Sequence, residues 1–127
     1  TMDIHYSKHA SAYAKALSEA CAAENVNTNN SKLESVLRNI SKYSTKMRNN
    51  AGGHYNHEMF WQTMKPGGAA VPSGQLGASI IQAFGSFETF KTQFADAAKS
   101  RFGSGWAWLI INSNNALSIV STPNQDN

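Results

Sequence analysis

Two stretches in the first half of the chain repeat apolar residues at spacings of three and four, which is typical of amphipathic helices. The first stretch covers residues 2–23, and the second runs from Leu33 to Trp61. A polar, asparagine-rich segment after Ala23 separates them and favours a turn. Because two helices joined by a short polar loop pack in opposite directions, we expect an antiparallel helical hairpin. The start of the first helix then lies beside the end of the second.

The second helix has a start signal and an irregularity. Ser31 followed by Glu34 forms the spacing of a capping box, and the apolar pattern from Leu33 to Trp61 predicts one long helix after it. The pair Gly52 and Gly53 falls inside this helix, where each glycine costs about 1 kcal/mol. We therefore expect another group to approach the helix closely at the two glycines, or to need the room that they leave.

Residues 64–74 are rich in glycine and proline and mark the boundary between two domains. The apolar residues Leu76, Ile80 and Phe84 predict a short helix that Gly85 ends. Ser86 is a suitable N-cap for a further helix before the break at residues 102–105. Its buried face is predicted to contain Phe87, Phe90, Phe94, Ala97 and Ala98.

The last part of the chain has the pattern of a β-hairpin. Residues 106–111 are apolar on both faces, as in a central strand that is covered on both sides. A polar turn at 112–115 leads to residues 116–121, which we expect to pair back with them. The predicted fold class is therefore α+β. An antiparallel helical hairpin domain at 1–65 precedes a C-terminal α/β domain at 74–127 with a small antiparallel sheet.

Composition limits the function classes. Hydrophobic residues make up 41% of the 127 residues, which suffices for a core, and no apolar run approaches the roughly 20 residues of a membrane span. The single cysteine, Cys21, excludes an internal disulfide. The net charge of +3 is mild, and Lys and Arg do not cluster with aromatic residues. We expect neither a nucleic acid nor a membrane as partner, whereas a small anionic substrate suits this charge.

The end of the second helix carries candidate chemistry. His54, His57 and Trp61 are three and four residues apart, so they fall on one side of the helix. Two imidazoles beside an indole suggest a metal site with an aromatic wall. The alternative is a pair of histidines whose hydrogen bonds are satisfied inside a packed helix.

The first helix carries a second set of candidate residues. His5, His9 and Tyr13 stand at i, i+4 and i+8, on a face that otherwise consists mainly of alanine. An amphipathic helix with polar-tipped residues along its edge would give the same pattern. The antiparallel hairpin nevertheless predicts that His5 lies near His57, because it brings the two helix ends together.

Four blocks of sequence, taken in order, resemble the iron/manganese superoxide dismutase family. The blocks are Met2–His9, Asn49–Trp61, Phe102–Leu109 and Asn124–Asp126. The resemblance implies that His5 and His57 are metal ligands, that Tyr13 is the gateway tyrosine, and that His9 is its neighbour at the channel and the subunit contact. It further implies that Gln125 hydrogen-bonds the solvent on the metal. The pocket walls implied by the resemblance are Trp61, Trp106 and Trp108.

The resemblance also implies an activity and a cofactor. The family is metal-dependent and converts superoxide to O₂ and H₂O₂. Gln125, with Gly53 leaving space for it, resembles the manganese type, because the iron type usually places its glutamine at the position of Gly53. We therefore expect manganese, with iron as the alternative, in a homodimer or tetramer. We expect a cytoplasmic location, with the periplasm or an organellar matrix as alternatives.

By the same resemblance, an aspartate ligand and a third histidine ligand would follow residue 127, and a further segment would precede Thr1. We therefore expect a central segment of a longer subunit that is inactive and metal-poor when expressed alone, since catalytic metal sites keep at least three protein ligands. One alternative is a non-enzymatic metal- or haem-binding helical module, which an absorption spectrum would reveal. A basic nucleic-acid binder is a second alternative, and its affinity would depend steeply on salt.

Overall fold

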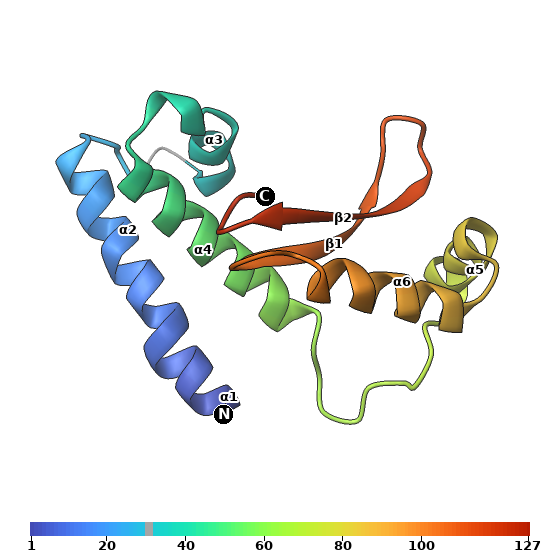
Figure 1. Ribbon diagram of the computed structural model, residues 1–127. Coiled ribbons are helices and arrows are strands. Elements are labelled where there is room, and N and C mark those ends of the chain that lie inside the picture. The colour runs from blue at the N-terminus through green and yellow to red at the C-terminus, as the bar shows by residue number, and fades with distance from the viewer. Residues whose placement is uncertain (30–31) are drawn as a thin grey trace. The chain divides into compact units, whose positions relative to one another are not determined.

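A computed structural model describes residues 1–29 and 32–127 (Figure 1). The chain divides into two compact units. The first unit contains Thr1–Met64 together with Gln125–Asn127, and the second contains Lys65–Asn124. Helices make up most of the first unit, whereas the second combines helices with a sheet. The mixture of helices and strands confirms the predicted α+β class.

The first helical arm is continuous, as predicted for residues 2–23, but its winding changes. Helix α1 (Met2–Ile4) leads into a π-helical segment, His5–Ala10, and then into α2 (Ser11–Ala23). The Ser11 hydroxyl donates to the Ser7 carbonyl over 2.6 Å near the end of the π segment. Because π turns change which side chains share a face and often occur at functional sites, the stretch that carries His5 and His9 departs from ordinary helical geometry.

The second arm is not the single long helix that the apolar pattern predicts. It consists of α3 (Leu33–Arg38), a 3₁₀ turn at Ile40–Lys42, and α4 (Thr45–Gln62). Ser44 begins α4, because its hydroxyl oxygen accepts from the backbone N–H of Met47 over 3.1 Å. The prediction of one helix was therefore wrong. The predicted capping box at Ser31 lies outside the described residues.

A contact between the arms fixes this new helix start. The Glu24 carboxylate at the end of α2 accepts from the Ser44 hydroxyl over 2.6 Å and from the Ser44 backbone N–H over 3.1 Å. The Ser44 backbone N–H, which would bond to a carbonyl one turn earlier in a continuous helix, therefore has Glu24 as its partner. The helix therefore restarts at the residue that Glu24 holds.

Helices α2 and α4 lie side by side and run in opposite directions (Figure 1), which confirms the predicted hairpin. Small side chains allow the two helices to approach closely, and two larger side chains complete the core between them. The buried core consists of Ala20, Cys21, Val36, Met47 and Ala51. Burial raises the pKa of the Cys21 thiol, and the charge of Glu24 raises it further, so Cys21 packs as a small neutral side chain.

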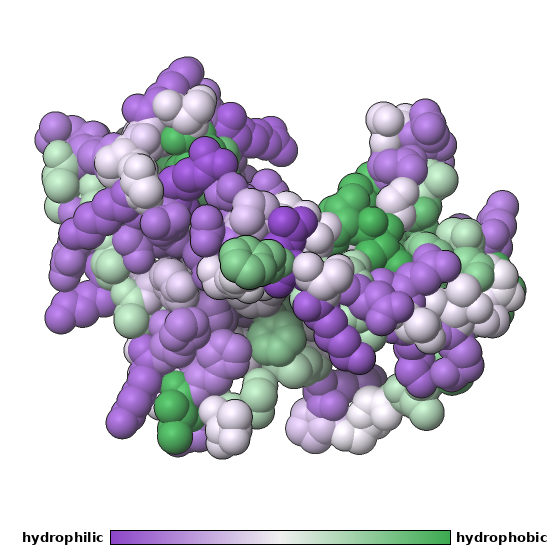
Figure 2. Space-filling model, viewed as in Figure 1, coloured by the Kyte–Doolittle hydropathy of each residue, from purple (hydrophilic) through white to green (hydrophobic). Residues whose placement is uncertain are grey.

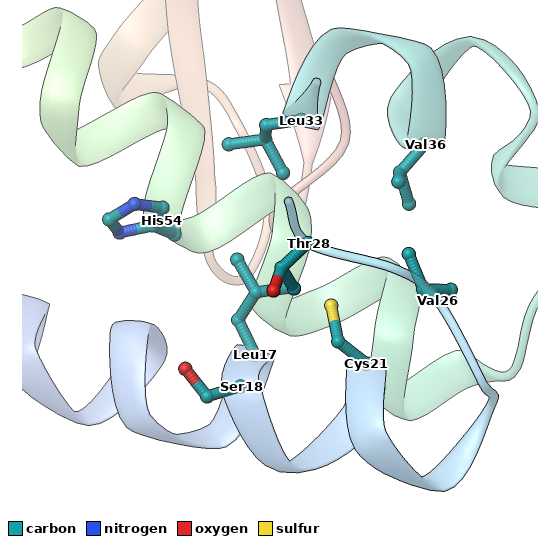
Figure 3. A pocket seen from close by; sticks show the side chains of 8 residues that line it. All are labelled: Leu17, Ser18, Cys21, Val26, Thr28, Leu33, Val36 and His54. Atoms are coloured by element: carbon teal, nitrogen blue, oxygen red, sulfur yellow. The ribbon is translucent and has the colours of Figure 1, made fainter. Parts of the chain in front are cut away.

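A cavity of about 190 Å³ lies beside this core (Figure 3). Figure 3 shows residues of α2 on one side and His54 of α4 on another, with Leu33 and Val36 of α3 completing the wall. The lining is mostly apolar and consists of Leu17, Ser18, Cys21, Val26, Thr28, Leu33, Val36 and His54. His54 therefore borders the hairpin core.

In the second unit, the end of the first helix and the start of the next lie where the sequence predicts. Helix α5 (Gly74–Phe84) ends at Gly85, whose φ of +82° is a conformation that favours glycine. Helix α6 (Phe87–Lys99) begins after Ser86, whose hydroxyl oxygen accepts from the Thr89 N–H over 3.0 Å. The rings of Phe84, Phe90 and Phe94 pack in a row and join the two helices.

Strands β1 (Gly105–Ile111) and β2 (Leu117–Pro123) form the predicted antiparallel hairpin. Helix α6 packs against both strands. Strand β1 is half-buried over Trp106–Leu109, whereas Ile111 is 70% exposed and β1 pairs with β2 alone within the described part of the chain, so coverage of both faces stays a prediction. Figure 2 shows the resulting hydrophobic patch over the hairpin, where Ile110, Ile111 and Val120 are exposed.

Among the described residues, no helix is both long enough and apolar enough to cross a bilayer. Helix α4, with 18 residues, contains charged and amide side chains along its length.

Candidate metal centre

Two histidines from the two arms of the hairpin meet ring to ring. The Nε2 atoms of His5 and His57 are 3.0 Å apart, and the ring planes are almost perpendicular at 89°. Two nitrogens at this separation can both reach one metal ion at the usual distance of about 2.0–2.1 Å. The predicted proximity of His5 and His57 is confirmed, whereas their role as ligands stays a prediction.

A hydrogen bond to the backbone fixes the orientation of the His57 ring. Its side chain is 2% exposed, and its Nδ1 lies 2.6 Å from the carbonyl oxygen of Gly53. Because a carbonyl oxygen only accepts, we assign the ring proton to Nδ1, which leaves the lone pair of Nε2 directed toward His5. A backbone partner of this kind is the usual support of a metal-binding histidine.

The protonation state of His57 also suits a metal ligand. Burial is the main cause that lowers the pKa of His57, and the neighbouring histidines lower it further, against the opposing effect of the Gly53 carbonyl. The ring therefore favours its neutral form. Neutral imidazole is the form that binds metal ions, so His57 can bind one without first losing a proton.

His9 and Tyr13 complete a ring of side chains around this pair. The His9 ring lies 5.3 Å from the rings of both His5 and His57, measured between centroids. The Tyr13 ring stacks on His57 at 5.4 Å and meets His9 edge to face at 5.3 Å. The structure thus brings together the three residues that stand at i, i+4 and i+8 on the first helical arm.

Large aromatic side chains enclose one side of the histidine pair. The Trp61 ring lies 5.2 Å from His5 and 6.0 Å from His57, and the Phe60 ring lies 6.1 Å from His5. The indole N–H of Trp61 is buried and has no hydrogen-bond partner within the described residues. Because a buried donor normally has a partner, this N–H indicates room for an acceptor beside the site.

This arrangement can hold a first-row divalent metal ion beside aromatic side chains. Neutral imidazole nitrogens suit manganese, iron, copper and zinc alike, so the donors themselves do not select one metal. His5 and His57 supply two donors, and catalytic sites normally have at least three protein ligands. The residues therefore fit part of a metal centre.

His54 does not join this group. The spacing of three residues predicted that His54 and His57 share one side of α4, but His54 borders the apolar cavity of Figure 3, whereas His57 faces His5. Residues three apart on a helix differ in direction by about 60°, which is enough to place one ring in the core and the other at the site. The partner of His57 comes from the other helix.

Comparison with known proteins gives a consistent result over both units. The alpha-hairpin domain of iron/manganese superoxide dismutases matches residues 1–65, and the C-terminal domain of the same enzymes matches residues 72–127. The chain belongs to the iron/manganese superoxide dismutase family. This family assignment confirms the resemblance that the four sequence blocks indicated.

Relatives named for manganese and for iron are both similar to the chain. Superoxide dismutase (Mn) 3 of Leptolyngbya boryana is 44% identical over all of this chain and 54% of its own length. Superoxide dismutase (Mn) of Acinetobacter baylyi is 46% identical over all of this chain and 56% of its own length. Superoxide dismutase (Fe) of Raoultella planticola is 42% identical over 99% of this chain and 75% of its own length. The chain thus spans about half the length of the first two relatives.

Gln125, the glutamine of the predicted site, belongs to the first unit, and its backbone is held by a hydrogen bond. The Asn56 side-chain N–H donates to the Gln125 carbonyl over 3.2 Å, and the Asn56 amide oxygen accepts from the Asn127 side chain over 2.9 Å. Asn56 is 1% exposed, so both of these bonds are made at a buried amide. The segment that carries Gln125 is therefore docked on α4.

Each of the two glycines of α4 lies against a different neighbouring residue. A Cβ atom at Gly53 would fall on the ring of Tyr13, and one at Gly52 would fall on the carbonyl oxygen of Gln125. The expectation of a close approach at these glycines is confirmed. The nearest atoms to Gly53 belong to Tyr13 and those nearest to Gly52 belong to Gln125, and the expectation that Gly53 leaves space for the Gln125 side chain stays a prediction.

The remaining predicted wall residues lie in the second unit. The rings of Trp106 and Trp108 stack at 5.9 Å with an interplanar angle of 30°. The Trp108 indole N–H donates to the Thr122 hydroxyl over 2.8 Å across the β-hairpin. Their role as pocket walls stays a prediction.

Sequence reasoning missed the residues that fasten the C-terminal segment. Arg48 donates to both carboxylate oxygens of Asp126, over 2.7 and 2.9 Å, one residue beyond Gln125. Arg48, Gly52 and Asn56 are spaced by four on α4 and so form one face. This spacing could have indicated that another segment packs against this face of α4. It does not identify which segment does so.

Proposed function

We propose that this chain forms the hairpin and part of the second domain of a superoxide dismutase that converts superoxide to O₂ and H₂O₂. The observation that carries the proposal is the pair of imidazole nitrogens 3.0 Å apart, His5 and His57, in a chain that belongs to this family. We propose manganese as the cofactor and iron as the alternative, since the relatives include proteins named for each metal. Superoxide is a small anion, which the net charge of +3 attracts.

In this proposal, His5 and His57 hold the metal through Nε2. When bound, the metal supplies the one-electron redox chemistry of the reaction. The Gly53 carbonyl keeps the proton of His57 on Nδ1, so that Nε2 stays a donor. The Tyr13 hydroxyl delivers protons, supported by the stacking of its ring on His57. His9 lines the channel beside Tyr13, supported by its exposure and by their edge-to-face contact.

The other roles concern water and its exclusion. We propose that Gln125 presents its side-chain amide to solvent in the pocket, supported by the fixed backbone that Asn56 provides. Trp61 excludes water from the histidine pair, which its position at 5.2 Å from His5 supports. Trp106 and Trp108 act as further walls in this proposal, and their stacked rings support a rigid aromatic surface.

Domain boundaries, assembly and location are also proposals. We propose one domain at residues 1–65 and a second that begins at 74, which is supported by family matches that end at 65 and begin again at 72. We further propose a homodimer or homotetramer, without nucleic acid or membrane as partner. A cytoplasmic location stays a prediction.

The test uses the full-length protein loaded with manganese or iron. We expect about stoichiometric metal by mass spectrometry and rapid consumption of superoxide, with both reduced in His57→Gln and in His5→Gln. His54→Gln is the matched control, because it changes the same residue type on α4 outside the histidine pair. A fully loaded protein without dismutase activity would refute the proposed function, and circular dichroism identifies any variant that fails to fold.

A further inference from the structure

Helix α4 carries two rows of residues that face different partners. The second row consists of Gly53 and His57, whose carbonyl oxygen and ring nitrogen bond to each other. The first row contacts the segment Gln125–Asn127 and consists of Arg48, Gly52 and Asn56. Because residues four apart on a helix share a face, each row is a continuous strip along α4. The same stretch of helix therefore holds Gln125 and a candidate metal ligand.

Asn56 is the member of the first row that adjoins this ligand. It precedes His57 in the sequence, and the two side chains are 1% and 2% exposed. The Asn56 side-chain N–H donates to the Gln125 carbonyl over 3.2 Å, and its amide oxygen accepts from the Asn127 side chain over 2.9 Å. A buried amide normally has hydrogen-bond partners, and both of these partners belong to one segment. Asn56 thus fastens the backbone of Gln125 to α4 beside His57.

The glycine pair brings the same two residues close to the helix. A Cβ atom at Gly52 would meet the carbonyl group and the Cβ atom of Gln125. The next residue, Gly53, supplies the carbonyl oxygen that lies 2.6 Å from Nδ1 of His57. One turn of α4 therefore contacts Gln125 with one residue and orients His57 with the next.

This arrangement matters for the side chain of Gln125. Glutamine has a long side chain with several rotatable bonds, so its amide has a defined position only where the backbone is held. Hydrogen bonds around a metal centre tune the reduction potential of the metal. In the proposed function, the Gln125 amide faces solvent in the pocket. A shift of the Gln125 backbone on α4 would change that hydrogen bond and leave both histidine ligands in place.

We propose that Asn56 is a positioning residue, which sets the reduction potential of the metal centre by holding Gln125 on α4. The inference rests on the metal centre of the proposed function. Asn56 acts through the backbone of Gln125 and needs no contact of its own with the metal. An N–H donor favours the more negative form of the solvent beside it, and negative charge favours the oxidised metal. Loosening Gln125 should therefore raise the potential.

The test measures the reduction potential of the manganese-loaded full-length protein by redox titration. We expect Asn56→Ala to raise this potential by about 59 mV or more, which corresponds to a tenfold shift in a one-electron equilibrium. Its metal content should stay unchanged, because both histidines remain. Asn50→Ala is the matched control on α4, since the Asn50 side chain donates to the Lys46 carbonyl of the same helix. The potential of Asn50→Ala should equal that of the unsubstituted protein.

A double-mutant cycle separates positioning from a general loss of structure. In the Gln125→Ala background, Asn56→Ala should no longer change the potential, because the residue through which it acts is gone. Met47→Ala removes a core side chain outside the first row, so it should lower stability and leave the potential unchanged. An effect of Asn56→Ala that persists undiminished in Gln125→Ala would overturn the inference.

Gly52→Ala displaces Gln125 by another route and keeps Asn56. It decides the question if circular dichroism shows that Asn56→Ala does not fold. Alanine favours the helix, but its Cβ atom would push the Gln125 carbonyl away from α4. We expect the same upward shift of the potential, and the same loss of the effect in Gln125→Ala. A folded Gly52→Ala protein with an unchanged potential would contradict the proposed positioning.

Hydrogen exchange of the metal-free full-length protein tests the docking step without a metal. Asn56→Ala should speed exchange in the peptide that contains residues 125–127 at least tenfold, whereas Asn50→Ala should not. Faster exchange without a shift of the potential would overturn the inference, since the docking would then have no effect on the metal.

Dismutase activity tests the proposed function separately. A fully loaded protein without this activity would refute the proposed function, and its potential in the Asn56 and Gln125 variants would still decide the inference. An active enzyme whose potential does not respond to Asn56→Ala would leave the proposed function standing and reject the role of Asn56.

Discussion

The ring of Tyr13 occupies the space that a side chain at Gly53 would fill. Glycine at this position costs the helix about 1 kcal/mol relative to alanine. In return, the phenol ring stacks on His57 with 5.4 Å between centroids. The glycine therefore positions a predicted proton donor against a predicted metal ligand.

Gly53→Ala is expected to destabilise the protein by about 1–3 kcal/mol, although alanine favours helices, because the added methyl group forces Tyr13 away from His57. Urea denaturation gives this free energy of unfolding. Gly68→Ala is the control, since a Cβ atom there would meet its nearest atom, the Lys65 carbonyl oxygen, at an ordinary 3.5 Å. Equal stability of Gly53→Ala and the unsubstituted protein would show that Tyr13 does not pack there.

Tyr13→Phe separates the packing of this residue from its chemistry. Phenylalanine keeps the ring on His57, so we expect unchanged metal content and a change in stability below about 1 kcal/mol. Loss of the hydroxyl should slow dismutation about tenfold or more at high superoxide concentration, because a positioned acid contributes about 10²–10⁴-fold in many enzymes. Pulse radiolysis across a pH range measures the rate. Unchanged rates at every pH would remove Tyr13 from the proton path.

The ion pair between Arg48 and Asp126 makes stability depend on pH at the acid end. The hydrogen bonds from Arg48 are the main cause that lowers the pKa of Asp126 below its ordinary value. A carboxyl group with a lowered folded pKa stabilises the fold above its unfolded pKa of about 3.9. That contribution disappears as the pH falls through the folded value, because the folded carboxylate then takes up its proton as well.

Asp126→Asn should therefore be less stable than the unsubstituted protein at pH 7, and the difference should shrink as the pH falls below about 4. Urea denaturation at a series of pH values measures both quantities. The exposed Asp96 provides the control, because Asp96→Asn changes an acid in the second unit and should leave this pH dependence unchanged. A difference between Asp126→Asn and the unsubstituted protein that is constant from pH 7 to pH 3 would contradict the assignment.

The sequence predicted those helix ends that depend on contacts between neighbouring residues in the chain. Gly85 ends α5 and Ser86 begins α6 because each acts on the backbone of its immediate neighbours. The start of α4 at Ser44 escaped prediction, because it involves Glu24, which lies 20 residues earlier. A helix start that is fixed through a tertiary contact leaves little trace in the apolar periodicity.

The candidate site shows the same division between local and distant contacts. The proximity of His5 and His57 follows from the antiparallel hairpin, which the sequence pattern predicts. The docking of the C-terminal segment does not, because Arg48 and Asp126 are 78 residues apart and no periodic pattern joins them. His9 was predicted as a neighbour of Tyr13, but its equal distance from both other histidines depends on the π winding, which the spacing did not reveal.

The last prediction concerns the residue on which the hairpin core centres. Met47 in the first turn of α4 is 0% exposed and packs among small side chains of the core. Met47→Ala should cost about 2–5 kcal/mol, because small neighbours such as Ala20 and Ala51 cannot fill the cavity that it leaves. Met64→Ala, at a position that is 41% exposed, is the control and should cost less than about 1 kcal/mol.

Metal binding offers a second measurement on the same variant. Met47 lies ten residues before His57 on α4. Its loss should therefore weaken the fold without changing the positions of His5 and His57. If so, a metal ion at a free concentration of about 100 times its dissociation constant should raise the free energy of unfolding of Met47→Ala by about 2.7 kcal/mol. The unsubstituted protein should gain the same amount. A variant that is destabilised and also gains nothing from the metal ion would show that its folded state no longer forms the histidine site, since an ion that binds the folded state alone always stabilises it.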